Sequence, residues 1–212
     1  MSRVVDLTLA LVSGDKGIKI EPARRLETDG WNATTLSLYS HCGTHVDAFV
    51  HFGVGSQTID TIAVENLIGP AWVADIRPVE PRVLIEPEHL GAIAEQFRPG
   101  ESLLICTGWS DYYGQDKYRN GLPRVSAELA QWCADKKTKM LGVEPPSVAD
   151  VNNVEELTTI HQILFKGGVI VVEGLSNLTS LSRPRVTFIA LPLKIANGDG
   201  APARAIAIED ND

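Results

Sequence analysis

The 212-residue chain has little cysteine, few basic residues relative to acidic ones and no long apolar segment. Its three cysteines, Cys42, Cys106 and Cys133, are odd in number and widely spaced, which excludes a disulfide-stabilised scaffold. No run approaches the roughly 20 apolar residues that cross a bilayer, so we expect no membrane partner. The 19 Lys and Arg against 27 Asp and Glu leave a net charge of −8, which argues against nucleic acid as a partner.

The rest of the composition is typical of a folded globular protein. Hydrophobic residues make up 44% of the chain and charged residues of both signs 22%, which excludes intrinsic disorder. The length fits one domain spanning residues 1–212. Asp6 interrupts the apolar stretch 4–12, and no small-residue cleavage site follows, so this stretch is interpreted as a strand rather than a signal peptide. We therefore expect a cytoplasmic protein with reduced cysteines.

Short apolar runs bounded by Gly, Pro or charged residues predict strands, and they outnumber the helical patterns. In the clearest helix Ser126 can cap the N-terminus, and Leu129, Trp132 and Cys133 share one face. Strands and helices do not alternate strictly, which favours a mixed α/β (α+β) domain over a doubly wound parallel sheet. The predicted strands are 4–11, 34–39, 71–76, 102–107, 169–172 and 204–208, and the predicted helices are 87–96, 126–137 and 155–165.

The strongest chemical signal is a cluster of histidines early in the chain. His41, His45 and His51 lie within eleven residues, with Asp47 among them. Imidazole and carboxylate are common ligands of zinc, manganese and iron. On a strand, at about 3.3 Å per residue, His41 and His45 would be roughly 13 Å apart, too far for one metal. A metal site therefore requires a bend, which Gly43-Thr44 can supply. The alternative is a polar loop with solvated histidines, or a core histidine bonded to backbone.

A second segment, far downstream, strengthens the metal interpretation. Glu173 ends the apolar run 169–172, where a buried carboxylate is costly unless it is paired, hydrogen-bonded or metal-bound. His161 lies on the predicted helix 155–165, which Gly167-Gly168 ends. Helix, turn and strand can return His161 towards Glu173, and four imidazoles with two carboxylates would make a binuclear site. A glutamate that meets solvent or an arginine at the strand end is the alternative.

These segments resemble the cyclase family of metal-dependent hydrolases, of the kynurenine formamidase and isatin hydrolase type. The residues His41-x-Gly43-Thr44-His45-x-Asp47-x-x-x-His51-Phe52 match its HxGTHxDxPxHF signature, and Val172-Glu173-Gly174-Leu175-x-Asn177-Leu178 resembles its closing metal block. The likeness extends over residues 4–209. The chain departs from the signature at Phe49, where the family usually has proline, and this difference bears on substrate specificity.

The resemblance implies a compact swivelling β/β/α domain with a mixed, partly barrel-like sheet, assembled as a homodimer or homotetramer. It also implies one or two divalent ions, Zn²⁺ or Mn²⁺, per subunit. His51 would be the general base and Glu173 a helper in catalysis. The implied metal ligands are His41, His45 and Asp47, with His51, His161 and Glu173 completing a second or bridging position.

The activity that the resemblance implies is hydrolysis of an amide or formamide C–N bond in a small substrate, as in an arylformamidase acting on N-formylkynurenine. Ring opening of a cyclic amide such as isatin would use the same residues, and a metal-binding domain without turnover is the non-enzyme alternative. Trp109, after a strand end, and Phe49 belong to a group of aromatic residues in a chain that has only 13, which hints at an aromatic substrate. Ordinary core packing is the alternative for both side chains.

Overall fold

The computed structural model describes residues 2–210, which form twelve strands and five α-helices together with short 3₁₀ turns. The helices in chain order are α1 (Leu26–Asp29), α2 (Ile93–Gln96), α3 (Asp116–Asn120), α4 (Ala127–Asp135) and α5 (Val154–Lys166). The strands are β1 (Arg3–Asp6), β2 (Ile18–Arg24), β3 (Ala33–Leu38), β4 (His45–Asp47), β5 (Ile68–Asp75), β6 (Leu84–Ile85), β7 (Ser102–Cys106), β8 (Arg124–Val125), β9 (Met140–Val143), β10 (Ile170–Glu173), β11 (Arg185–Pro192) and β12 (Gly200–Glu209).

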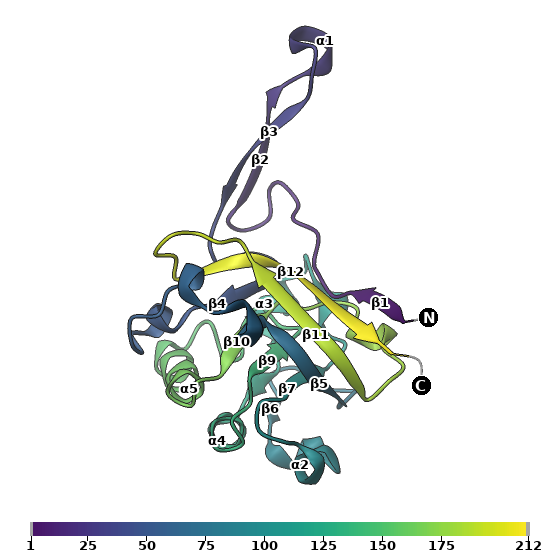
Figure 1. The fold of residues 1–212 in the computed structure, drawn as a ribbon, viewed down its shortest axis with the longest axis vertical. Coiled ribbons are helices and arrows are strands. Elements are labelled where there is room, and N and C mark those ends of the chain that lie inside the picture. The colour runs from purple at the N-terminus through teal and green to yellow at the C-terminus, as the bar shows by residue number, and fades with distance from the viewer. Residues whose placement is uncertain (1, 211–212) are drawn as a thin grey trace.

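A mixed sheet of eight strands forms the centre of the fold, in the order β1-β12-β11-β5-β7-β9-β10-β4. Strands β5, β7, β9 and β10 are parallel, and the other pairings in this sheet are antiparallel. Because β4 also pairs with β12, seven strands close into a barrel-like sheet, and β1 extends β12 beyond the closed ring (Figure 1). The prediction of a mixed α/β fold with a partly barrel-like sheet is therefore confirmed.

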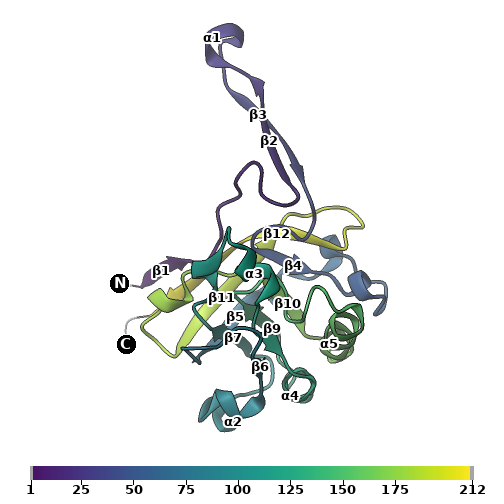
Figure 2. The same cartoon turned by 180° about the vertical axis from the view of Figure 1, so that it is seen from behind.

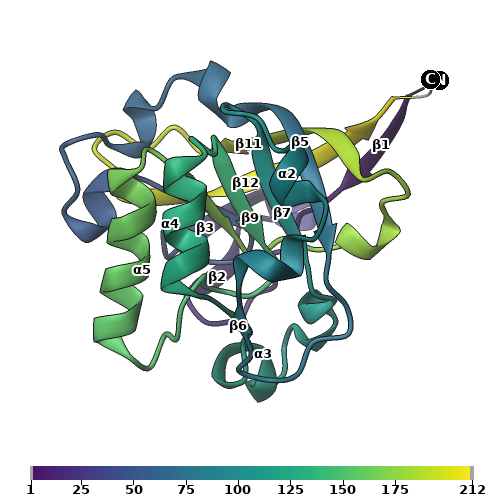
Figure 3. The ribbon, with the colours of Figure 1, turned by 90° about the horizontal axis from the view of Figure 1, so that it is seen from below.

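The central strands bury both of their faces, so two cores form from alternate residues of the same strands. On β7, Leu104 and Cys106 belong to the core inside the ring, while Leu103 and Ile105 face the helices. Figure 3 shows α4 and α5 side by side against this outer face. This period of two is the pattern expected of a strand that is covered on both sides.

Two of the three predicted helices are confirmed. The Ser126 hydroxyl accepts from the Leu129 N–H at the start of α4, and the Asn153 side chain caps α5 in the same way. The prediction of one helix over 87–96 is wrong, because the chain breaks at Gly91. A 3₁₀ turn, Pro87–Leu90, precedes that glycine, and α2 follows it. Gly91 has φ 52° and ψ −131°, a conformation that a side chain disfavours.

The predicted strand 4–11 is shorter in the structure. It ends at Asp6, whose carboxylate accepts from the Thr8 N–H, and Thr8 then makes only an isolated bridge with Leu175. Strands β2, β4, β6, β8, β9 and β11 were not predicted. Within residues 2–210 no helix is long and apolar enough to cross a membrane.

Strands β2 and β3 form a separate hairpin, with α1 at its tip, that stands out from the rest of the molecule (Figures 1 and 2). Leu26, Trp31 and Leu36 on this arm are each 57% exposed. A two-stranded hairpin has little stability in water when nothing covers either face. The exposed apolar side chains therefore make the arm a candidate contact surface.

Candidate metal centre

Three elements, β4, β10 and α5, bring four of the predicted ligands together at one end of the barrel-like sheet. His45 and Asp47 are two residues apart on β4 and share one of its faces. Glu173 is paired with His45 across the β4–β10 ladder, so its side chain lies beside them. His161 reaches the same place from α5, about two turns into that helix. The predicted return of His161 towards Glu173 is confirmed, because Nε2 of His161 is 3.3 Å from Oε1 of Glu173.

The bend that the spacing of His41 and His45 requires occurs at Gly43. This residue has φ +59°, and a Cβ there would come within 2.6 Å of the Leu11 side chain. The turn folds His41 back over β4, and its Nδ1 lies 2.7 Å from Oδ1 of Asp47. Glycine is therefore favoured at this position by its backbone conformation, and the Leu11 side chain would have to move to admit a larger residue.

Asp47 is the centre of the arrangement. Its Oδ1 is 2.7 Å from Nδ1 of His41 and 3.6 Å from Nε2 of His45, and its Oδ2 is 3.5 Å from Nε2 of His161. Glu173 contacts two of these rings. Its Oε2 is 3.2 Å from Nε2 of His45, and its Oε1 is 3.3 Å from Nε2 of His161. His45, Asp47, His161 and Glu173 are all at most 4% exposed. Two buried carboxylates and three imidazoles thus face one another.

Candidate ligand atoms in this cluster lie within 4.8 Å of one another in two groups that share Asp47. A third group combines His51 with His41 and with Asp199. Each of these groups could therefore hold a cation, and the first two have Asp47 in common. The first two groups are His41, His45 and Asp47, and Asp47, His161 and Glu173.

Hydrogen bonds on the outer side of two rings direct their inner nitrogens towards the carboxylates of Asp47 and Glu173. Nδ1 of His45 donates to the Gly43 carbonyl at 3.0 Å, and Nδ1 of His161 donates to the Leu157 carbonyl at 2.7 Å. Nε2 of His45 is buried and, although Oε2 of Glu173 lies 3.2 Å away, it makes no well-aligned hydrogen bond with the residues that the structure describes. A buried polar atom without a partner is costly, and a metal ligand commonly has its other ring nitrogen bonded in this way. The donor set therefore fits a divalent cation.

The carboxylates control protonation in this cluster. Burial lowers the pKa of His161, but hydrogen bonds and negative charge from Asp47 and Glu173 outweigh it and raise the pKa to about 10. Burial is likewise outweighed at His41, where Asp47 and Asp199 raise the pKa to about 9. Burial acts to raise the pKa of Asp47, yet hydrogen bonds from the two histidines hold it well below its usual value. Without a metal, protons occupy the inner nitrogens.

His51 differs from the other three histidines. Its side chain is 24% exposed, and its ring stacks on His41 with centroids 3.8 Å apart. Burial lowers the pKa of His51, and the positive charges of His41 and His161 lower it further against the opposing carboxylates. At neutral pH it is therefore an unprotonated imidazole, which can accept a proton.

Phe49 and Trp109, predicted to contact substrate, both lie in packed surroundings. Phe49 is partly buried and packs against Phe165, with ring centroids 5.4 Å apart. Trp109 is 1% exposed, and its Nε1–H donates to the Tyr118 carbonyl. These contacts are those of core residues, and the role of either residue towards substrate stays a prediction.

A further buried carboxylate, Glu144, is fully occupied by the protein itself. It accepts hydrogen bonds from the backbone and hydroxyl of Thr107, from the Trp109 N–H and from the Ser110 hydroxyl. These donors hold the loop after β7 in place. Glu144 thereby positions the turn that carries Trp109.

Asp199 was missed by the sequence analysis. It lies in the connection between β11 and β12, with its carboxylate 3.2 Å from Nε2 of His41 and 3.7 Å from Nδ1 of His51. In the sequence it is an aspartate between two glycines, a pattern that indicates only a turn. The 158 residues that separate it from His41 leave no local signal of their contact.

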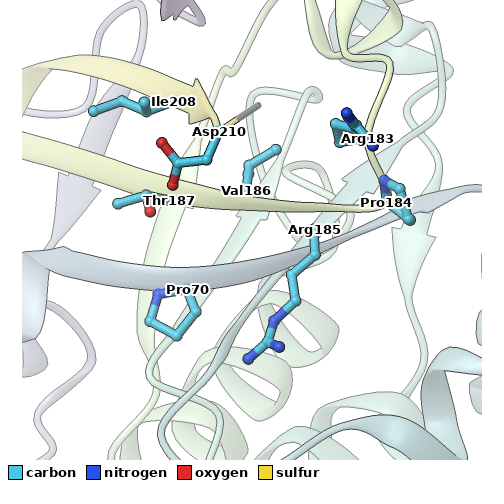
Figure 4. Close-up of a pocket in the computed structure, with 8 residues that line it drawn as sticks. All are labelled: Pro70, Arg183, Pro184, Arg185, Val186, Thr187, Ile208 and Asp210. Atoms are coloured by element: carbon cyan, nitrogen blue, oxygen red, sulfur yellow. The ribbon is translucent and has the colours of Figure 1, made fainter. Parts of the chain in front are cut away.

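A depression with a volume of about 370 Å³ lies on another part of the surface. Figure 4 shows the residues that line it. Pro70 of β5, Arg185 and Thr187 of β11 and Asp210 line it, and its described lining contains no histidine. It is therefore separate from the candidate metal centre, which remains the place where reactive side chains converge.

Gly200, paired with Asp47 across the β4–β12 ladder, sets the position of His41. A Cβ on Gly200 would lie 2.6 Å from Cε1 of His41 and 2.9 Å from the Val46 carbonyl oxygen. We expect Gly200→Ala to displace His41 and to weaken metal binding by about 10- to 100-fold, since overpacking costs about 1–3 kcal/mol. Competition with a chelator measures this, and Gly69→Ala, which meets only the flexible Lys139 amine, is the control. Equal affinities in the two variants would contradict the prediction.

Comparisons with protein families, curated proteins and solved structures find relatives of this chain that agree with one another. Residues 5–150 match the family described as putative cyclase. The chain is 32% identical to a kynurenine formamidase of Salinibacter ruber over 97% of its own length and 94% of the relative. It is similar to the structure of isatin hydrolase A from Ralstonia solanacearum, with a TM-score of 0.85, 26% identity and coverage of 99% and 92% of the two chains. A structure described as a potential metal-dependent hydrolase with cyclase activity gives a TM-score of 0.79 at 25% identity, with both chains fully covered.

Proposed function

Because the chain belongs to the cyclase family, as a metal-dependent hydrolase of amide C–N bonds, we propose that its substrate is an arylformamide and its products are formate and an arylamine. The observation that carries this proposal is the buried Asp47 carboxylate shared by two ligand groups, with the unprotonated His51 beside them. A relative named kynurenine formamidase, aligned over nearly the whole of both chains, supports the choice of a formamide.

We assign the two ligand groups to two ions. His41, His45 and Asp47 would hold one ion, and Asp47, His161 and Glu173 the other. A divalent metal in such a site lowers the pKa of water and polarises the carbonyl that is attacked. The nitrogen and oxygen ligand set suits zinc and manganese alike, so we propose Zn²⁺ or Mn²⁺.

His51 is the proposed general base. Its ring is unprotonated at neutral pH and lies beside the ligand groups, stacked on His41. It would take a proton from the water that attacks the formyl carbon. It would then return that proton to the nitrogen as the C–N bond breaks. Glu173 would assist by fixing the rings of His45 and His161, and its own position is held by the Val148 N–H at 2.8 Å.

Aromatic side chains beside His41 and His51 favour an aryl substrate. The Tyr39 ring lies 5.5 Å from that of His41, and Tyr39 is 56% exposed. The ring of Phe52 lies 4.4 Å from that of His51. An aromatic ring of the substrate can pack against these faces while its formyl group reaches His51.

We expect N-formylkynurenine to be hydrolysed with a higher kcat/KM than isatin, whose ring amide is the second candidate because of the likeness to isatin hydrolase A. Both reactions are followed by absorbance with the same metal-loaded protein. A higher kcat/KM for isatin would move the substrate class to cyclic amides and would contradict our choice.

Metal binding is expected to release protons. His41 and His161 have pKa values raised to about 9 and about 10, so both rings are protonated at pH 7 in the metal-free protein and must lose a proton to bind. The pKa of His45 is raised as well, by Glu173 and Asp47 against the effect of burial. Calorimetric titration with zinc in two buffers of different ionisation enthalpy should therefore show release of at least two protons, and affinity should rise from pH 6.5 towards 9. Heats that do not depend on the buffer would contradict this.

The raised pKa values of His41 and His161 also predict how the stability of the metal-free protein changes with pH. A histidine whose pKa is higher in the folded than in the unfolded state contributes stability below pH 6.5, which is lost as the pH rises through about 9 and 10. We expect the melting temperature of the metal-free protein to fall over this range. A melting temperature that rises there would contradict the assignment of the protons.

We further propose that residues 1–212 act as a single cytoplasmic domain that assembles as a homodimer or homotetramer. The exposed apolar side chains of the β2–β3 arm support association with another copy. The proposed partners are the small-molecule substrate and other copies of the chain, without nucleic acid or membrane, in line with the net charge of −8.

A further inference from the structure

Asp199 is held beside the metal centre by the strand that follows it. Its backbone carbonyl accepts from the Ala48 N–H at 2.9 Å, and the next residue, Gly200, pairs with Asp47. The Asp199 backbone is thereby fixed against the β4 segment, although its half-exposed side chain reaches solvent. Its carboxylate points at the outer edge of the His41 ring, where Oδ2 is 3.2 Å from Nε2.

The two nitrogens of His41 face different partners. Nδ1 is directed at Asp47, the residue shared by both ligand groups, whereas Nε2 is directed at Asp199. The other two buried histidines follow the same pattern, with one nitrogen inward and the other donating to a backbone carbonyl, that of Gly43 or that of Leu157. For His41 the outer acceptor is a carboxylate instead. A metal-ligating histidine whose outer N–H is bonded to a carboxylate has a fixed tautomer and a more basic inner nitrogen.

We propose that Asp199 is a positioning residue that accepts the Nε2–H of His41 and so presents the unprotonated Nδ1 to a metal. This proposal rests on the metal-binding function proposed above. Nδ1 of His51 is 3.7 Å from the same oxygen, beyond hydrogen-bond distance, so His41 is the partner that Asp199 orients. Direct ligation by Asp199, in the group that it forms with His41 and His51, is the competing role.

The two roles differ in what the removal of the carboxylate does to metal binding. Loss of an outer partner weakens binding by about 10- to 100-fold but leaves every ligand in place, so saturating metal still fills the site. Loss of a ligand reduces the number of ions bound at saturation. We therefore expect Asp199→Ala to raise the dissociation constant for zinc by about 10- to 100-fold with unchanged stoichiometry at saturation. Asp199→Asn, which keeps an acceptor oxygen without the charge, should lie between Asp199→Ala and the unmodified protein.

Chelator competition with zinc measures the dissociation constants, and elemental analysis of the saturated proteins measures the stoichiometry. Asp60→Asn is the matched control, because Asp60 accepts from the Asn197 N–H in the same connection and does not contact His41. We expect its dissociation constant to stay within twofold of the unmodified protein. Nitrogen-15 NMR of the imidazoles gives a second readout, since zinc-loaded protein should carry the His41 proton on Nε2 with slow exchange, and Asp199→Ala should exchange it faster.

The possible results separate this inference from the proposed function. If the unmodified protein binds no zinc, the proposed function fails. If it binds zinc and Asp199→Ala binds it equally well, the inference alone is overturned. A lower number of ions bound at saturation in Asp199→Ala would overturn the inference in favour of direct ligation. An equal loss of zinc affinity in Asp60→Asn would overturn it as well, because any disturbance of the connection between β11 and β12 would then have the same effect. Should Asp199→Ala fail to fold, the isosteric Asp199→Asn and the NMR signal decide the question in the same way.

Discussion

Replacement of Asp47 by asparagine is expected to cause the largest loss of activity of any single change. Asp47 is the one residue common to both ligand groups, and it contacts His41, His45 and His161 while only 1% exposed. Without its charge neither ion would be held in place, and the contribution of the metal to catalysis is worth several kcal/mol. Because each 1.4 kcal/mol is a factor of ten, turnover should fall by about 10³-fold or more.

The same change should also reduce the metal content and the stability of the protein. Removing one partner of a buried ion pair costs about 3–5 kcal/mol, because the remaining charges lose their compensation. The measurements are metal per subunit, the melting temperature and kcat/KM. Asp75→Asn is the control, since Asp75 pairs with the exposed Arg77 at the end of β5 and lies outside both ligand groups. An Asp47→Asn protein with full metal content and full turnover would remove Asp47 from its central position.

Replacement of His51 by alanine is expected to separate catalysis from metal binding. His51 lies outside the two groups that share Asp47, so most of the metal should remain bound. Its neutral ring is the proposed general base, and loss of such a group lowers the rate by about 10²- to 10⁴-fold. The effect should appear in kcat at unchanged metal content, measured with N-formylkynurenine at saturating zinc.

The matched control for this variant is His89→Ala. His89 is an exposed histidine at the 3₁₀ turn before α2 and lies outside the metal centre. It should leave kcat within about twofold of the unmodified protein. Unchanged turnover in His51→Ala would show that another group carries the proton. A parallel loss of metal would show that His51 is a ligand.

The sequence was sufficient to predict which side chains come together at the candidate metal centre, because they lie in two short segments with recognisable spacing. The need for a bend between His41 and His45 follows from strand geometry alone, and the structure places that bend at Gly43. The return of His161 to Glu173 could be predicted because a helix, a turn and a strand connect them directly. The buried carboxylate at the end of an apolar run was the signal.

The features that were not predicted depend on contacts between distant parts of the chain. Strand β4 has only three residues and exists because β10 and β12 pair with it on its two sides. Strand β9 is four buried residues without alternation, so periodicity gives no sign of it. The contact of Asp199 with His41 is created by closure of the ring between β4 and β12, which no local pattern encodes. The break at Gly91 shows the opposite case, in which a local backbone conformation overrides a helical pattern.

The central claim is that a metal held by this cluster is required for hydrolysis of an arylformamide. The most direct test is the rate of N-formylkynurenine hydrolysis by one preparation in three states: as purified, after removal of metal by a chelator, and after addition of stoichiometric Zn²⁺ or Mn²⁺. We predict one or two ions per subunit in the active protein, loss of turnover with the metal, and recovery when it is restored. Turnover that persists in metal-free protein would contradict the claim.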